Sequence, residues 1–407
     1  MPGFARGSMF PGTLTAPPRA AGGSVEFSLY VHIPFCAARC PYCDFTITIV
    51  RERPEAAYVD ALLAELRSRW AEGPWAVGTL RSVYLGGGTP SILAPELIAK
   101  ILDEARGLGG GAFQPAEITL EANPEGLSAS ALSEWREAGV NRLSLGAQSF
   151  DARHLEFLGR GHRAEDIRAA VALARGAGFE NVSLDLIFGM PGQDLASLQT
   201  DLGEAVALGP QHVSAYNLTL EPGTRLHRDW KQGKLEPPEE GLQAEMFEAI
   251  ENRLARAGLA RYEISNFACP GFESSHNRHY WRRGSSLGIG TGAHSFLASA
   301  RGGRRWWNVR DHRRYIARAL ADEPVEEGAE DLTDDDARRE WVFLRLRGVE
   351  GFAVEEFRRA FKHDVDEVFP GVIAALIADG LVGDDPERVA LTRRGRLLSN
   401  EAFMRFF

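Results

Sequence analysis

Short apolar runs alternate with longer amphipathic segments between about residues 24 and 223. The run FSLYVHIP (27–34) is aliphatic and β-branched, which is typical of a buried strand. The segment PEAAYVDALLAELRSRW (54–70) has apolar residues at helical spacing. This alternation predicts right-handed βαβ units and a parallel sheet. The five further strand-like runs are RSVYLGGGTPS, AEITLEANPEGL, NRLSLGAQSF, NVSLDLIFGMPGQ and HVSAYNLTLEPGT.

Polar or flexible residues mark the carboxyl ends of the first five runs. Cys36 follows the first run, GGGTP (86–90) closes the second, and Glu121, Gln148 and Asp185 lie in or just after the next three. In parallel α/β folds this edge of the sheet carries the functional site. One functional edge repeated over so many units favours a barrel over an open sheet with a single crevice. We therefore expect an α/β fold with a partial (βα)6 barrel over residues 24–260.

The pattern changes after the sixth run. Residues 261–325 are dense in Asn, His, Gly, Ser and aromatic residues, and form a connecting region too polar to be core alone. Residues 326–407 contain three helical segments, a short strand and a helical tail, which predicts a smaller, mostly helical domain that resembles a winged helix. Its many acidic residues favour a docking or lid role over DNA binding. Residues 1–23 are rich in Gly, Pro, Ala and Arg and are interpreted as a flexible leader, with an organellar transit peptide as the alternative.

Composition and charge narrow the setting. The chain has 407 residues and a net charge of −10, which argues against nucleic acid as a partner, because phosphates need a basic face. We find no apolar run long enough to cross a bilayer and no secretory signal. Three of the four cysteines lie close together, which indicates a metal site in a reducing compartment rather than disulfides. These features predict a cytoplasmic protein.

The cysteines form the motif C-x3-C-x2-C through Cys36, Cys40 and Cys43. A [4Fe-4S] cluster needs soft thiolate ligands that converge from one loop, and this spacing provides three of them. Three thiolates leave one iron open to bind a further molecule. A zinc site completed by a distant histidine is one alternative, although no matching pair of cysteines follows. Three buried structural cysteines are another, which the proline and polar neighbours of the loop disfavour.

The motif at the end of the first strand of an α/β repeat is similar to that of the radical S-adenosylmethionine (SAM) superfamily. The resemblance implies a [4Fe-4S] cluster and SAM as cofactors, with the amino and carboxylate groups of SAM on the open iron. YVHIPFC, GGGTPS, EANP, LSLGAQSF and LDLIFGMPGQ together resemble the oxygen-independent coproporphyrinogen III oxidase-like branch of this superfamily. The resemblance covers nearly the whole chain from residue 24 onward.

The same resemblance implies residues that bind SAM. The glycine loop would receive the methionine amino group, Arg160 would pair with the carboxylate, and Asp185 would meet a ribose hydroxyl. Taken alone, each residue is also explained by a tight turn, a solvated charge, a salt bridge or, for Tyr30, a core aromatic. The full set is Tyr30, Gly87, Gly88, Thr89, Glu121, Gln148, Arg160 and Asp185.

Two features separate the members of this branch. The oxidases usually carry a further cysteine two residues after the third ligand, and Phe45 occupies that position here. The segment HNRHYW (276–281), with YEISNFA before it and GAHSF after it, resembles the haem chaperones of the branch. The two hypotheses are therefore a haem chaperone, which need not be an enzyme, and an oxidase that decarboxylates propionate side chains. A radical SAM enzyme with an unrelated substrate is a third reading.

HNRHYW supplies an imidazole and two flat aromatic rings, which suit haem iron and a porphyrin face. We expect His276 to ligate haem, with His279, His294 and the thiol of Cys269 as alternatives. Each could instead be a structural side chain whose hydrogen bonds are all made within the protein. The arginines that could meet the haem propionates are Arg278, Arg282 and Arg283.

The resemblance also implies partners. A haem chaperone would act on haem and on apo-haemoproteins, including respiratory proteins of the membrane, where it would be peripheral during delivery. Reduction of the cluster would need an electron donor such as a flavodoxin-like or ferredoxin-like protein.

Overall fold

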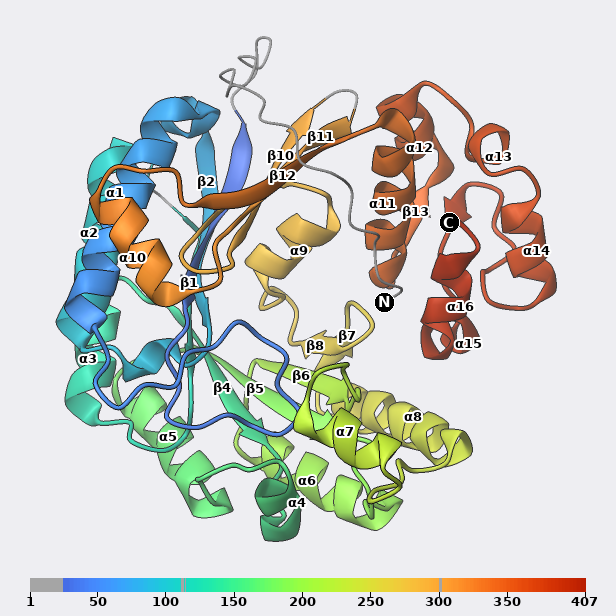
Figure 1. Ribbon diagram of the computed structural model, residues 1–407. Coiled ribbons are helices and arrows are strands. Elements are labelled where there is room, and N and C mark those ends of the chain that lie inside the picture. Colours follow the sequence, from blue (N-terminus) through green and yellow to red (C-terminus); the bar gives the residue numbers. More distant parts are fainter. Residues whose placement is uncertain (1–24, 111–112, 114, 300–301) are drawn as a thin grey trace.

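The computed structural model describes residues 25–110, 113, 115–299 and 302–407 (Figure 1). The leader predicted for residues 1–23 lies outside this part of the chain. Six parallel strands form the centre of one long sheet, in the spatial order β1 to β6. They are β1 (Glu26–Ile33), β2 (Thr79–Gly87), β3 (Glu117–Ala122), β4 (Arg142–Gln148), β5 (Asn181–Phe188) and β6 (His212–Asn217).

Helices follow these strands and cover the outer face of the curved sheet (Figure 1). Strands β1 and β6 are not paired with each other, so the barrel is open on one side. The predicted partial (βα)6 barrel is confirmed. The helices are α1 (Glu55–Glu72), α2 (Pro95–Gly109), α3 (Ala129–Glu137), α4 (Ala152–Phe157), α5 (Ala164–Gly176) and α6 (Leu195–Ala207), with short 3-10 turns η1 (Pro74–Val77) and η2 (Pro90–Ile92).

The connecting region extends the sheet beyond both of its ends. Beyond β1, strand β9 (Ser285–Ile289) pairs in parallel and leads to the antiparallel strands β10 (His294–Ser299), β11 (Gly302–Asn308) and β12 (Glu326–Leu332). Beyond β6 lie β8 (Asn266–Ala268) and β7 (Ala260–Arg261). The periodicity did not predict these strands, because runs such as SSLGIG are short and rich in glycine. The main sheet continues to Leu332, past residue 325, where the sequence pattern changes.

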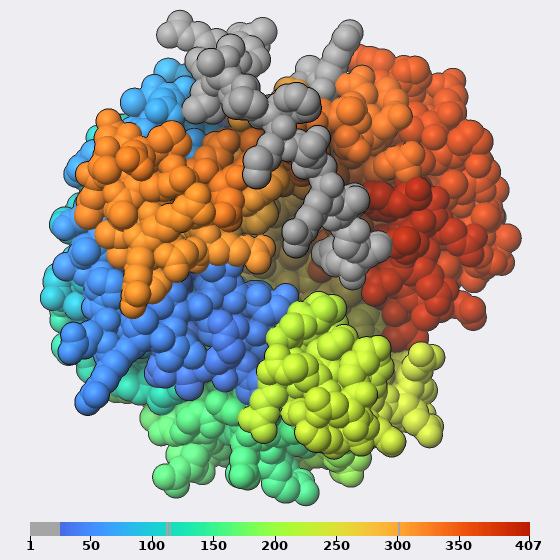
Figure 2. All heavy atoms as spheres, viewed as in Figure 1, coloured from blue at the N-terminus to red at the C-terminus, as the bar shows by residue number. Residues whose placement is uncertain are grey.

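Three helices from the middle of the chain border the open side of the barrel. They are α7 (Arg225–Lys231), α8 (Glu240–Arg256) and α9 (Ser275–Trp281), while α10 (His312–Leu320) packs against α1 on the outside. Helix α9 lies inside the curve of the sheet (Figure 1), where it contacts β1, β2 and β9. Figure 2 shows a hollow on this face, between the barrel and the C-terminal helices.

The C-terminal helices have their own hydrophobic core, centred on Trp341, Phe352 and Phe357. Thr333 starts the first of these helices, because its hydroxyl accepts a hydrogen bond from the Asp336 amide while the Asp336 carboxylate accepts one from Thr333. The elements are α11 (Asp334–Arg347), β13 (Phe352–Ala353), α12 (Val354–Phe361), α13 (Val365–Val368), α14 (Val372–Ala378), β14 (Arg388–Val389), α15 (Arg393–Leu397) and α16 (Ser399–Met404). Strands β13 and β14 pair as a small antiparallel ribbon beside these helices. None of the helices within the described ranges is long and apolar enough to cross a membrane.

Candidate functional site

The three cysteines of the motif lie on the loop that follows β1. Backbone hydrogen bonds from Cys36 to Thr48 (3.1 Å) and from Thr48 to Pro34 (2.7 Å) close this loop. All three thiols are half-buried and line one cavity of about 600 Å³ at the carboxyl end of the strands. Burial raises the pKa of both the Cys36 and the Cys43 thiol. A set of three sulfur ligands on one short loop fits an iron–sulfur cluster with one open iron.

Two side chains from other strands and loops reach the sulfurs. The Thr89 hydroxyl donates to Cys36 Sγ at 3.6 Å, and Arg160 Nη1 donates to Cys40 Sγ at 3.8 Å. Hydrogen bonds to cluster sulfurs tune the reduction potential and hold the ligands in place. The sequence singled out Thr89 and Arg160 for SAM, and their contacts with the cysteines are an additional feature of the structure.

The glycine loop packs directly against the end of β1. A Cβ atom at Gly88 would lie 2.8 Å from the backbone of Pro34, and one at Gly87 would lie 2.5 Å from the His32 ring. Gly87 also has a φ of 113°, a conformation that favours glycine. The amides of Gly88 and Thr89 donate to carbonyls of the first strand and the cysteine loop. These glycines therefore serve as a close-packed turn and also form a wall of the cavity.

Two half-buried carboxyl groups face the same cavity. Glu121 accepts hydrogen bonds from the Tyr84 hydroxyl (2.7 Å) and from the Gly87 amide (3.0 Å), and burial raises its pKa to about 7. Asp185 accepts a hydrogen bond from the Ser144 hydroxyl (3.0 Å), and burial raises its pKa as well. From the sequence we expected a ribose hydroxyl as the partner of Asp185. In the structure the Ser144 hydroxyl is a hydrogen-bond partner from within the protein.

Gln148 and Arg160 complete this wall. Gln148 has a φ of 64°, an unusual conformation for a residue other than glycine, and it follows an irregularity in β4. Arg160 donates to Asn123 Oδ1 (2.6 Å) and to the Gly146 carbonyl (3.2 Å). The structure thus brings most of the expected residues to one cavity: Cys36, Cys40, Cys43, Gly87, Gly88, Thr89, Glu121, Gln148, Arg160 and Asp185.

Tyr30 and His276 line a second cavity of about 480 Å³ instead. Tyr30 was expected in the SAM pocket, but its hydroxyl donates to His32 and its ring faces the rings of Tyr84 and His276. The second cavity adjoins the first. The residues that line both are Phe45, Tyr84, Gly87, Glu121 and Asn277.

His276 is enclosed by aromatic rings. It is 3% exposed, and its ring centroid lies 4.8 Å from that of Tyr84 and 5.0 Å from that of Tyr280. Burial lowers its pKa to about 3, so the imidazole is neutral at neutral pH. Nδ1 lies 2.9 Å from the Ser82 hydroxyl, which donates its own hydrogen to Ser28. The ring hydrogen is therefore on Nδ1, and Nε2 carries a lone pair.

Glu117 fastens the start of α9 to the barrel. Its carboxylate accepts hydrogen bonds from the Ser274 hydroxyl (3.3 Å) and from the amides of Ser275 (3.0 Å) and His276 (3.1 Å). A carboxylate at a helix start satisfies amides that have no partner within the helix. Glu117 was not among the residues predicted from the sequence, although an acidic residue at the start of a buried strand is a signal that could have identified it.

The alternative haem ligands differ in how they are engaged. His279 Nε2 donates to the Ser285 carbonyl at 2.8 Å, whereas His294 lines the second cavity and stacks on Trp307, with ring centroids 5.8 Å apart. Cys269 is half-buried against the main core and lines neither cavity. Its position is that of a structural cysteine.

The expected propionate partners also differ from one another. Arg283 is held by Glu340 on α11 and by the Gly302 carbonyl, and its guanidinium covers the Phe296 ring. Arg278 faces Glu273 at 3.9 Å. Besides Arg160, the arginines of the described chain that line these cavities are Arg142 in the first and Arg310 in the second, and neither was predicted from the sequence.

Comparison with known proteins agrees with this geometry. Residues 30–204 match the sequence model of the radical SAM superfamily, and residues 332–398 match that of the HemN C-terminal domain. Coproporphyrinogen III oxidase (HemN) from Escherichia coli, a radical SAM enzyme, has a similar structure, with a TM-score of 0.80 and 26% identity over 94% of this chain and 90% of that one. The fold and the cysteine loop are those of a radical SAM protein.

Curated relatives narrow the class further. Heme chaperone HemW from Bacillus subtilis is 37% identical over 379 residues, which are 93% of this chain and 98% of that protein. Heme chaperone HemW from Escherichia coli is 35% identical, over 92% of this chain and 96% of that protein. The chain belongs to the HemW family of radical SAM proteins, which confirms the branch predicted from its motifs.

Proposed function

We propose that this protein is a haem chaperone, which binds haem and delivers it to apo-haemoproteins. The observation that carries the proposal is the state of His276. It is neutral, its Nε2 carries a lone pair, and it lies among aromatic rings at a cavity. A neutral imidazole is a common ligand of haem iron, and flat aromatic rings pack well on a porphyrin. The names of the HemW relatives support the same function.

We further propose that Cys36, Cys40 and Cys43 hold a [4Fe-4S] cluster and that SAM binds in the larger cavity beside it. Such a cluster supplies one-electron reduction of bound SAM. Thr89 and Arg160 would orient the sulfurs, while Glu121, Gln148 and Asp185 would face the polar groups of SAM. Because the two cavities share walls, SAM in one would lie next to haem in the other.

Oxidation of coproporphyrinogen III is the second candidate, because the fold resembles that of HemN. Phe45 argues against it. This residue occupies the position at which the oxidases resembled by the motif carry a further cysteine, and its side chain is 63% exposed between the two cavities. A benzyl group can pack on a porphyrin, but it cannot supply a thiol.

Partners and location follow from the proposed function. Haem and apo-haemoproteins would be its substrates, including membrane-bound respiratory proteins, with a flavodoxin-like or ferredoxin-like protein as electron donor. The proposed function implies a cytoplasmic location, with peripheral attachment to the membrane while haem is delivered.

The test is an anaerobic transfer assay. Protein with reconstituted cluster is loaded with haem and mixed with apomyoglobin, and coproporphyrinogen III with SAM and a reductant is tested in parallel. Transfer of haem without conversion of coproporphyrinogen III is expected. Conversion of the porphyrinogen without any stable haem complex would return the protein to the oxidases.

A further inference from the structure

Arg142 is a buried cation whose hydrogen bonds are incomplete. It is the first residue of β4, is 2% exposed, and its side chain lines the larger cavity. Its Nε atom is buried and, within the described part of the chain, has no hydrogen-bond partner. A buried charge is costly unless it is paired and hydrogen-bonded. The guanidinium therefore needs a partner that the side chains around it do not supply.

The acidic groups near Arg142 accept hydrogen bonds from other residues. Glu117 uses both carboxylate oxygens at the start of α9, and Asp185 accepts hydrogen bonds from Ser144 and Ser183. Burial opposes the charge on Arg142, but the attraction of Glu117 and other nearby groups outweighs this and raises its pKa. Arg142 thus stays charged, attracted by these acids at a distance.

The other charged side chains that line the cavity do not prevent an anion from binding at Arg142. Arg160, the other arginine that lines it, already donates to Asn123, Gly146 and Cys40. Burial raises the pKa of Glu121 to about 7 and also raises the pKa of Asp185, so burial opposes the negative charge on both carboxyl groups. Glu125 and Glu221 also line the cavity, and Glu125 lies 3.1 Å from His162.

We propose that Arg142 binds a carboxylate of a ligand held inside the barrel. The planar guanidinium matches a carboxylate with two parallel hydrogen bonds. The inference rests on the proposed function, whose two ligands both carry carboxylates, namely the haem propionates and the methionine carboxylate of SAM. The charge of Arg142 contributes, after burial and His279, to lowering the pKa of His276, so the two residues are close enough to interact.

The test pairs each ligand with an analogue that lacks the carboxylate. Affinities of haem and haem dimethyl ester, and of SAM and decarboxylated SAM, are measured on the cluster-loaded wild type and on Arg142→Met. For at least one of the two ligands, the preference of the wild type for the carboxylate form over its analogue is expected to fall on the order of tenfold in Arg142→Met. Arg153→Met, at an exposed arginine paired with Asp151, is the matched control and should keep it.

Each outcome decides the proposal. Loss of the haem preference identifies a propionate at Arg142, and loss of the SAM preference identifies the methionine carboxylate. Full preference for both carboxylate ligands in Arg142→Met, or none in the wild type, would overturn the assignment and leave water as the partner.

If Arg142→Met loses its cluster, Arg142→Lys replaces it, because lysine keeps the charge but not the fork. There, a several-fold weaker preference supports the proposal and an unchanged one overturns it. A wild type that binds no haem would contradict the proposed function, and the SAM pair would then decide on Arg142.

Discussion

The Nδ1 atom of His276 lies 2.9 Å from the Oγ atom of Ser82, and Ser82 in turn donates to Ser28. This short chain of hydrogen bonds joins α9 to β2 and β1 inside the barrel. It holds the histidine in the tautomer that leaves Nε2 free for iron. Partners of this kind orient a metal-binding imidazole and increase its basicity.

Replacing Ser82 with alanine should weaken haem binding without removing it. The variant loses the acceptor that fixes the His276 tautomer, so we expect haem affinity to fall about tenfold. Titration of the Soret band measures this. Ser149→Ala is the control, because this buried serine binds Asp201 and lines neither cavity. Equal haem affinity in Ser82→Ala and the wild type would contradict the role of Ser82.

Loss of one cluster ligand should abolish the brown absorbance of the reconstituted protein. In Cys40→Ala the loop offers two thiolates, which are too few to hold the cluster in place. Iron and sulfide analysis after anaerobic reconstitution measures the loss. Cys269→Ala should load as the wild type does, because Cys269 lies outside both cavities. A Cys40→Ala variant with full iron and sulfide would refute the ligand assignment.

Glu117→Gln should destabilise the fold. The amide cannot accept the three hydrogen bonds at the start of α9 as strongly as the carboxylate does, and Arg142 loses the acidic group that attracts it most strongly. We expect the free energy of unfolding in urea to fall by about 3 kcal/mol. Glu104→Gln breaks only a surface ion pair with Arg67 and should cost less than about 1 kcal/mol. Similar losses in both variants would mean that Glu117 does not anchor α9.

The pH dependence should separate stability from haem binding. Burial lowers the pKa of His276 to about 3 and that of His32 to about 4, whereas both have ordinary values near 6.5 when unfolded. Below about pH 6.5 the unfolded chain therefore binds more protons than the folded one, so these histidines lower the free energy of unfolding as the pH falls towards about 4.

Haem affinity should change little over the upper part of that range. Because His276 is already neutral, protons do not compete with iron between about pH 7.5 and about pH 5.5. Soret titrations across this range, together with urea unfolding at the same pH values, test both expectations. A tenfold loss of haem affinity per pH unit below the ordinary histidine pKa of about 6.5 would contradict His276 as the ligand and indicate a more exposed histidine instead.

The residue types of the site were easier to predict from the sequence than the burial of these residues inside the barrel. The six parallel strands and the cysteine loop follow from local patterns, because a buried strand and a ligand loop are each encoded over a few neighbouring residues. The burial of His276 depends on a short helix that enters the barrel from a distant part of the chain. Local periodicity carries no information about such a placement. Glu117 and Arg142 were missed for the same reason, since they gain significance only when β3, β4 and α9 meet.

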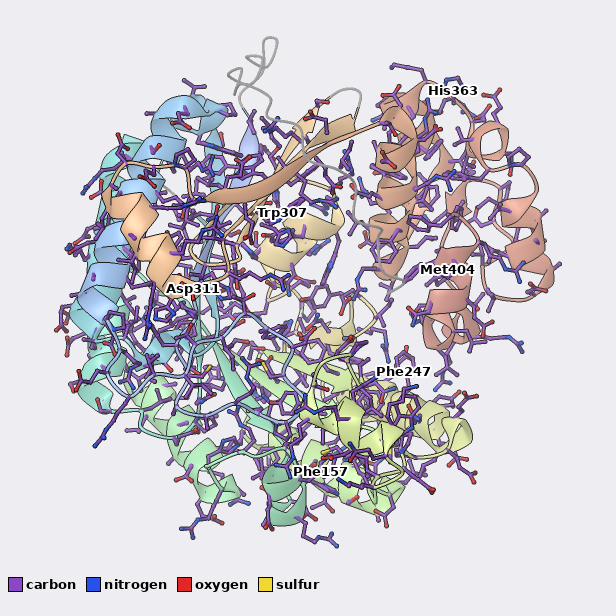
Figure 3. All side chains as sticks on the ribbon, in the orientation of Figure 1. Phe157, Phe247, Trp307, Asp311, His363 and Met404 are labelled. Carbon is purple, nitrogen blue, oxygen red and sulfur yellow. The ribbon has the colours of Figure 1, made fainter. Side chains whose placement is uncertain are left out.

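The most direct measurement is a haem titration of the anaerobically reconstituted protein, read at the Soret band for the wild type, His276→Ala, His294→Ala and His363→Ala. His363 lies in the turn between α12 and α13 (Figure 3), lines neither cavity, and is the control. A one-to-one complex that weakens strongly in His276→Ala alone, with the cluster intact in every variant, is the predicted result. A complex of unchanged affinity and spectrum in His276→Ala would contradict the assignment of His276 as the haem ligand.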